Sequence, residues 1–266
     1  MSAGVLQSER MPMPLGAANS FDDAAAAQME RMVADFGRMY RERNEALQEV
    51  AQAHHDALMR LSRAAEYRDD DTGVHIIRIG KLAGALATFL GLRPDFARLL
   101  EQAAPMHDVG KIGIPDRVLK KPGPLTPEER AEMDRHPAIG AEILGRSRIP
   151  LFQLAAEVAL SHHERFDGSG YPSRLAGDAI PMSGRIVAVV DYFDALTMDR
   201  CYRPAFSDAR ALGMLVGERG KAFDPRVVDC FLEHRDSLMD LRNRVNRYDG
   251  EAAVTMGEAS PSVPFP

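Results

Sequence analysis

A long stretch without proline near the N-terminus is the feature that most restricts how this chain can fold. Between Phe21 and about Arg68 no proline occurs, and Ala, Met, Glu, Arg and Gln, which favour helices, predominate. Apolar side chains recur here at steps of three and four residues or their multiples: Met29, Met32, Phe36, Met39, Leu47, Val50, Leu58 and Leu61. This spacing places them on one face of a helix, so we predict one long amphipathic helix over residues 21–66.

The apolar face of such a helix needs a partner that covers it. A second copy of the chain could pair with it as a homodimeric coiled coil, although Gly37 and Arg43 interrupt the apolar seam. Alternatively, the face packs on the domain that follows in the same chain. The pattern alone does not choose between these two arrangements.

Signals for shorter helices recur beyond this segment, and we predict an all-α fold. A tail over residues 1–20 precedes the long helix, a helical bundle covers residues 67–240, and a polar tail covers residues 241–266. No apolar run approaches the roughly 20 residues that a membrane-spanning helix needs. The net charge of −6 argues against binding to a nucleic-acid polymer. We therefore expect a cytoplasmic protein.

Local signals divide the predicted bundle into helices. Gly91 ends one helix and Pro94 begins the next. Thr126 and Glu129 predict a capping box after a proline-rich loop. Residues 185–196 begin with β-branched side chains, but the length of the run favours a buried helix. The long loop between residues 165 and 181 is rich in glycine and proline, which is typical of a functional loop.

Histidines supply the chemistry. A single histidine is usually a core or surface residue, and we interpret His54, His55 and His234 in this way. Five others lie within the predicted bundle beside carboxylates: His75, His107, His136, His162 and His163. Imidazole together with carboxylate suits Fe, Mn, Zn or Ni and excludes the all-oxygen cage typical of calcium. The group predicts a buried metal site that holds more than one ion.

Six motifs occur in an order that strongly resembles the HD-GYP family of phosphodiesterases. They span about residues 60–235 and read RDDDTGVHIIRI (68–79), HDVGKIGIPD (107–116), HPAIGAEIL (136–144), HHERFDGSGYP (162–172), RIVAVVDYFDALT (185–197) and FDPRVVDCF (223–231). This agreement is far more specific than one His-Asp pair.

The resemblance implies an HD-domain helical bundle that hydrolyses the bacterial second messenger cyclic di-GMP to linear pGpG and, in a second cleavage, to GMP. It implies two or three divalent metals, Fe or Mn first and Zn or Ni as alternatives. The implied ligands are His75, His107, Asp108, His136, His162, His163 and Asp191, with Asp108 as a bridge and catalytic residue. Lys111 would neutralise the phosphate or the leaving oxygen, and the implied substrate contacts are Lys111, Tyr171, Asp194, Arg200 and Arg203.

Two positions depart from the family pattern. Members with a third metal carry a glutamate four residues before the first histidine, where this chain has Asp71. We favour a third metal at Asp71, although Asp69–Asp71 would also suit a solvated helix start. The family often reads Arg-Pro-Tyr where Arg200–Tyr202 reads RCY. The missing proline puts in doubt the turn that aims the arginines.

Other functions fit the same motifs. One is a receptor that binds cyclic di-GMP with low turnover and signals through a protein partner. Another is a phosphodiesterase for a hybrid cyclic dinucleotide, since the GYP motif does not select the bases. The N-terminal residues could also transmit a signal from a separate sensor or response protein.

Overall fold

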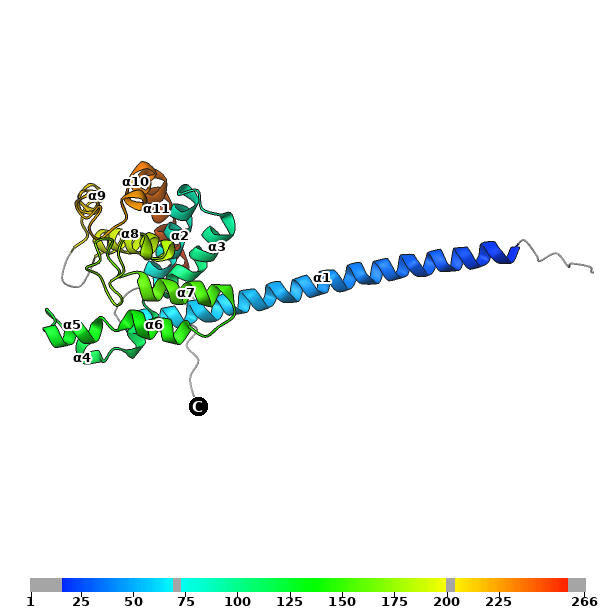
Figure 1. The fold of residues 1–266 in the computed structure, drawn as a ribbon, viewed down its shortest axis with the longest axis horizontal. Helices are drawn as coiled ribbons and strands as arrows, with labels where there is room; N and C mark the ends of the chain where they lie inside the picture. The colour runs from blue at the N-terminus through cyan, green and yellow to red at the C-terminus, as the bar shows by residue number, and fades with distance from the viewer. Residues whose placement is uncertain (1–15, 69–72, 200–203, 258–266) are drawn as a thin grey trace, which may run out of the picture. The chain divides into compact units, whose positions relative to one another are not determined.

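A computed structural model describes the backbone of residues 16–68, 73–199 and 204–257, and these residues form an all-α protein without strands, as predicted (Figure 1). The chain divides into two compact units, residues 1–54 and residues 55–266. No helix in these described ranges is long and apolar enough to cross a membrane.

Helix α1 (Gly16–Glu66) contains the amphipathic helix predicted over residues 21–66 and begins five residues earlier. Residues 16–20 of the predicted tail are therefore helical, and residues 1–15 lie outside the described part of the chain. The apolar side chains from Met29 to Val50 that form its stripe have exposed fractions of 51–68%. The described residues of the first unit thus form a helix, and the apolar side chains of its stripe from Met29 to Val50 are exposed.

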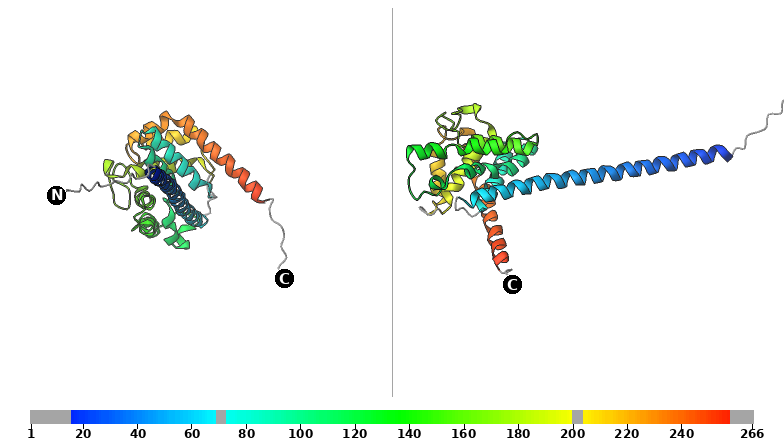
Figure 2. Two further views of the ribbon diagram at one scale, coloured as in Figure 1. Left: turned by 90° about the vertical axis from the view of Figure 1, so that its right-hand side faces the viewer. Right: turned by 90° about the horizontal axis from the view of Figure 1, so that it is seen from below.

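The second unit is a bundle around two helices, α2 (Val74–Phe89) and α8 (Met182–Thr197). Helices α2 and α8 contact each other, and α3 (Pro94–Ala103) and α7 (Pro150–Ser161) lie beside them (Figures 1 and 2). Further elements complete the bundle: η1 (Ala104–Met106), η2 (Val109–Gly113), α4 (Asp116–Leu119), α5 (Pro127–Met133), α6 (His136–Leu144), η3 (Gly177–Ala179), α9 (Asp208–Gly217), α10 (Pro225–Glu233) and α11 (Arg235–Gly257).

Helix α8 is the buried helix predicted from its apolar run. Ile186, Val189 and Phe193 are all buried, as expected for a helix that is apolar on most sides. The predicted ends of other helices are also confirmed. Gly91 adopts φ 71° after α2, and Pro94 is the first residue of α3.

The capping box predicted from Thr126 and Glu129 is present at the start of α5. The Thr126 amide donates to Oε2 of Glu129 at 2.8 Å, and the Glu129 amide donates to Oγ1 of Thr126 at 3.3 Å. The capping box therefore defines where α5 begins, and α5 contacts α4.

The predicted tail over residues 241–266 is wrong for its first part, because α11 runs from Arg235 to Gly257. Leu238 is buried, and the Arg242 guanidinium forms two bonds of 2.7 and 2.9 Å with the Asp208 carboxylate. Asn246 accepts a hydrogen bond from Nη1 of Arg78 at 3.2 Å. These contacts with distant residues stabilise a helix whose own sequence carries little apolar pattern.

Candidate metal centre

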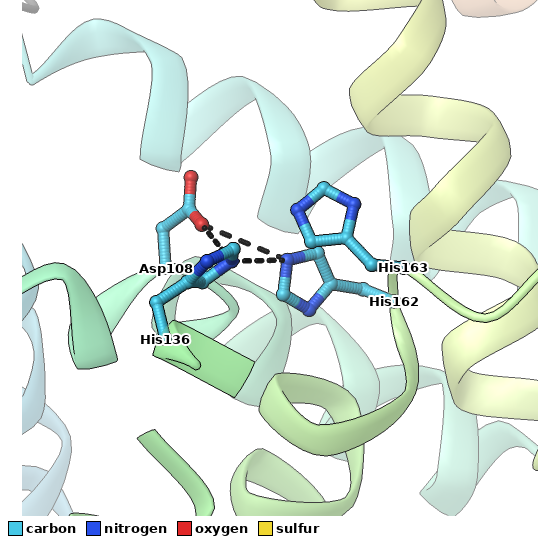
Figure 3. A group of neighbouring side chains, drawn as sticks. All are labelled: Asp108, His136, His162 and His163. Atoms are coloured by element: carbon cyan, nitrogen blue, oxygen red, sulfur yellow. Dashed lines mark hydrogen bonds and ion pairs between the residues drawn. The ribbon is translucent and has the colours of Figure 1, made fainter. Parts of the chain in front are cut away.

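Two groups of potential ligand side chains lie inside the second unit. The first contains Asp108, His136, His162 and His163 (Figure 3), and the second contains His75, His107 and Asp191. Within each group the ligand atoms lie within 4.8 Å of one another. Seven predicted ligands are therefore brought together, and Asp71 lies outside the described residues.

These side chains come from the ends and the middle of separate elements. His75 stands in the first turn of α2, and Asp191 lies within α8. His136 is the first residue of α6, and His162 directly follows α7. His107 and Asp108 lie between η1 and η2. Residues distant in sequence thus converge because α2, α6, α7 and α8 belong to one bundle.

Gly110 allows the closest approach within this arrangement. A Cβ atom at this position would overlap the carbonyl oxygen of His136 and lie 2.5 Å from the amide nitrogen of Gly140. Only glycine therefore lets η2 meet the start of α6 at this distance. The close contact brings Asp108 within reach of His136.

The Asp108 carboxylate faces both groups. Its Oδ1 lies 3.2 Å from Nε2 of His136 and 3.6 Å from Nε2 of His162. Dashed lines mark both contacts in Figure 3. Oδ2 of Asp108 lies 3.3 Å from Nε2 of His107 and 2.8 Å from Nζ of Lys111. One carboxylate therefore joins two neighbouring sets of ligand atoms.

Hydrogen bonds at the far side of four rings assign their tautomers. Nδ1 of His107, His136 and His162 donates to the carbonyl oxygens of Ala104, Met133 and Ala159 at 3.0, 2.9 and 3.0 Å, and Nδ1 of His75 donates to Oδ2 of Asp194 at 2.7 Å. Because Nδ1 carries the proton of the neutral ring, Nε2 of each neutral ring has a lone pair that faces the centre. This is the usual arrangement of histidines that bind metals.

The donor set fits divalent metals. Nε2 of His107 and Oδ1 of Asp108 are buried and have no hydrogen-bond partner among the described residues. Buried polar atoms without a partner are costly, and a divalent cation between the rings would satisfy them. Nitrogen and oxygen donors in this mixture suit transition metals.

The charges within the cluster favour an ionised Asp108 carboxylate. Burial raises the pKa of Asp108, but Lys111 and His107 outweigh this effect and hold it well below its usual value. Burial also opposes the charged form of His107, yet Asp108 and Asp191 raise its pKa to about 9. Burial and the neighbouring rings of His162 and His136 lower the pKa of His163 well below its usual value. Asp108 and His163 thus already have the protonation states that a metal ligand needs.

Tyr171 and Lys111, two of the predicted substrate contacts, border the cluster. The Tyr171 ring stacks on His163, with centroids 4.8 Å apart and planes 26° apart. Glu164 stabilises the loop that contains Tyr171. Its carboxylate accepts hydrogen bonds from the backbone amides of Ser173 and Leu175 at 2.7 and 2.9 Å. Glu164 lies within the HHERFDGSGYP motif, but the motif alone did not predict this role. Its position directly after the paired histidines was the available signal.

Asp194 requires a correction. It is 0% exposed, and its carboxylate accepts Nε and Nη2 of Arg78 at 2.7 and 2.8 Å as well as Nδ1 of His75. A carboxylate so enclosed cannot contact a substrate, and it orients His75 instead. Arg200 and Arg203 lie outside the described residues.

Comparisons with known proteins agree with this geometry. Residues 45–227 match the family model described as an HD domain. The cyclic di-GMP phosphodiesterase response regulator RpfG of Xanthomonas campestris pv. campestris is 49% identical over 196 residues, which cover 74% of this chain and 52% of that protein. The 3′3′-cGAMP-specific phosphodiesterase 2 of Vibrio cholerae is 44% identical over 182 residues, which cover 68% of this chain and 35% of that protein. The chain therefore spans about half, or less, of the length of these relatives.

A solved structure shows the same fold. The crystal structure of a cyclic GMP-AMP specific phosphodiesterase of V. cholerae aligns with a TM-score of 0.51 and 20% identity, covering 72% of this chain and 52% of the other.

Proposed function

Because this chain belongs to the HD domain family, we propose that it is a metal-dependent phosphodiesterase that hydrolyses cyclic di-GMP to linear pGpG and then to GMP. The observation that carries the proposal is the Asp108 carboxylate, whose two oxygens face two separate groups of ligand atoms. A relative named as a cyclic di-GMP phosphodiesterase, 49% identical over most of this chain, supports the choice of substrate.

The proposed ligands of two divalent metals are the seven side chains of the two groups, with Asp108 as the bridge. Fe or Mn is our first choice, with Zn and Ni as alternatives, and a third ion would use Asp71. Two such ions supply a nucleophile from water at neutral pH and stabilise the charge on the phosphate.

We assign the surrounding side chains to binding and charge. The Lys111 ammonium, beside Asp108, would neutralise the phosphate or the leaving oxygen, so it acts together with Asp108 in catalysis. Tyr171, whose ring stacks on His163, would contact a guanine base. Arg200 and Arg203 would grip a phosphate through their planar guanidinium groups.

A hybrid cyclic dinucleotide is the second candidate substrate. The relative named as a 3′3′-cGAMP-specific phosphodiesterase is 44% identical to this chain, only slightly less than the relative named for cyclic di-GMP. A receptor with low turnover is the third candidate, but the complete set of ligand side chains supports an enzyme.

The test uses full-length protein purified without oxygen and loaded with Mn²⁺ or Fe²⁺. Metal content is counted, and cyclic di-GMP and 3′3′-cGAMP are incubated separately while linear products are separated by chromatography. We expect turnover of cyclic di-GMP, and loss of metal and turnover in Asp108→Ala with the helical circular dichroism retained. Asp229→Ala, an exposed carboxylate on α10, is the matched control and should keep both.

Each candidate has its own result. Faster turnover of 3′3′-cGAMP would select the hybrid dinucleotide. Tight binding of cyclic di-GMP without product over hours would select the receptor.

We also propose that α1 pairs with α1 of a second copy. Its exposed side chains at Met29, Met32, Phe36 and Met39 follow the alternating steps of three and four that form a coiled-coil seam. Light scattering on Phe36→Glu should show a smaller particle than the parent chain, whereas Ala34→Glu, on another face of the helix, should not. Equal masses for all three chains would refute the dimer. The separate signalling partner and the cytoplasmic location stay predictions.

A further inference from the structure

Glu66, the last residue of α1, has no role in the function proposed so far. It is only 4% exposed, and its carboxylate has no hydrogen bond or ion pair with any described residue. Glutamate is rarely buried without a partner, because a buried charge without compensation is costly. The surroundings of Glu66 therefore call for an explanation.

The last turns of α1 lie against the segment that carries His107 and Asp108. Oγ of Ser62 donates to Sδ of Met106 at 2.9 Å, directly before His107. Glu66 follows Ser62 by four residues and so lies on the same face of the helix. Both side chains are buried, which places this face inside the second unit.

Arg68 fixes the other side of this contact. Its guanidinium donates to the carbonyl oxygens of Lys111 at 3.3 Å and Ile114 at 3.0 Å, and also to that of Ile112. Glu66 thus lies between two anchored contacts, one at residue 106 and one at residues 111–114. The segment between these anchors is the one that presents the bridging carboxylate.

The charges around Glu66 belong to the candidate metal centre. Burial raises the pKa of its carboxyl group, and the other groups that shift it are His75, Asp108, Lys111 and His107. Glu66 does not belong to either group of ligand atoms that lie within 4.8 Å of one another. The contacts of Ser62 and Arg68 and these charges therefore place Glu66 near the centre and outside both groups.

We propose that Glu66 is an outer carboxylate of the metal centre, which stabilises a divalent cation in the His75–His107–Asp191 group through intervening water. The inference rests on the proposed metal centre. A cation there would add to the partial charge compensation that His75, Lys111 and His107 give Glu66, which does not outweigh the effect of burial. Groups that stabilise a metal or its ligands from outside the coordination sphere change metal affinity by about 10- to 100-fold.

The test compares Glu66→Gln with the parent chain in metal-free and Mn²⁺-loaded form, by calorimetric titration with Mn²⁺ and by thermal unfolding. We expect about 10-fold weaker Mn²⁺ affinity and a smaller rise in Tm on loading. The metal-free variant should be at least as stable as the parent chain, because it lacks the unpaired charge. Glu66→Met, also neutral, repeats the test and should show the same loss of affinity.

The matched control is Asp224→Asn, which changes a buried carboxylate that is fully paired. Asp224 accepts Arg185 Nη1 at 2.8 Å and the Arg226 amide at 2.8 Å, so this variant should lower the metal-free Tm and leave Mn²⁺ affinity unchanged. Unchanged Mn²⁺ affinity in either Glu66 variant would overturn the inference while leaving the metal centre intact. A parent chain that binds no Mn²⁺ would instead refute the proposed metal centre itself.

Discussion

Replacing Asp194 by asparagine tests how strongly the buried network behind His75 stabilises this fold. The carboxylate is fully buried and accepts two bonds from Arg78 and one from His75. Asparagine has nearly the same shape, but its side-chain NH2 group would point at an N–H donor of Arg78 or His75 instead of accepting from it. The change would leave Arg78, itself 1% exposed, as a buried charge without compensation.

The magnitude follows from the burial of both partners. Removing one partner of a buried ion pair costs about 3–5 kcal/mol. For a unit of this size, about 1 kcal/mol corresponds to a shift in Tm of about 2–4 °C, so we expect the metal-free protein to unfold about 6–20 °C earlier. Thermal unfolding followed by circular dichroism at 222 nm measures this shift.

Asp229→Asn is the matched control. Asp229 also accepts two bonds from one guanidinium, that of Arg219, but its side chain is 52% exposed and that of Arg219 is 43% exposed. An exposed pair contributes about 0–1 kcal/mol, so its loss should shift the Tm by no more than about 4 °C. Equal shifts in the two variants would refute the argument that burial sets the cost.

Three further predictions concern other parts of the second unit. Gly110→Ala should lower both the Tm and the Mn²⁺ content, because its Cβ would overlap the backbone of His136; an unchanged metal content would contradict this account of the close contact. Burial opposes ionisation of Asp224, but Arg226 and Arg185 outweigh this effect and lower its pKa in the folded state. The ionised carboxylate therefore contributes to stability above about pH 4, the pKa of the unfolded state, and this contribution is lost as the pH falls toward the lower pKa of the folded state. Urea unfolding at pH 7 and pH 3 should therefore show a smaller loss of stability on acidification in Asp224→Asn than in the parent chain. Tyr171→Ala should raise the KM for cyclic di-GMP about 10-fold, since stacking on a base contributes about 1–3 kcal/mol, with the metal content unchanged; an unchanged KM would limit Tyr171 to packing on His163.

The side chains that form the two groups could be predicted to lie together because their residue types and motifs indicated a common site. Histidines beside carboxylates are rare enough in a helical bundle to stand out, and the order of the motifs named them. Their convergence also followed from the expected fold. The capping box at Thr126 and the buried helix α8 could be predicted for a similar reason, since both depend on neighbouring residues.

Features that depend on distant partners could not be predicted. Asp194 stands in a motif, but its burial depends on Arg78, which lies 116 residues earlier in the chain. Helix α11 has a weak apolar pattern and depends on the pairing of Arg242 with Asp208. Glu66 lies in none of the six motifs. Its spacing of four residues from Ser62 predicts only that the two side chains share one face of the helix. Interactions between charged residues that are distant in sequence cannot be recognised from the local spacing of apolar residues.

The shared carboxylate of Asp108 has a consequence for how the centre would fill. If two ions bind as proposed, a first ion that orders this side chain would help to prepare the second position, while the two positive charges would repel each other across it. The two binding steps would therefore be thermodynamically coupled, and by reciprocity the loss of either ion would change the affinity for the other by the same factor. A metal titration of this protein should depart from two identical, independent steps, and half-loaded protein is then a distinct species with its own stability.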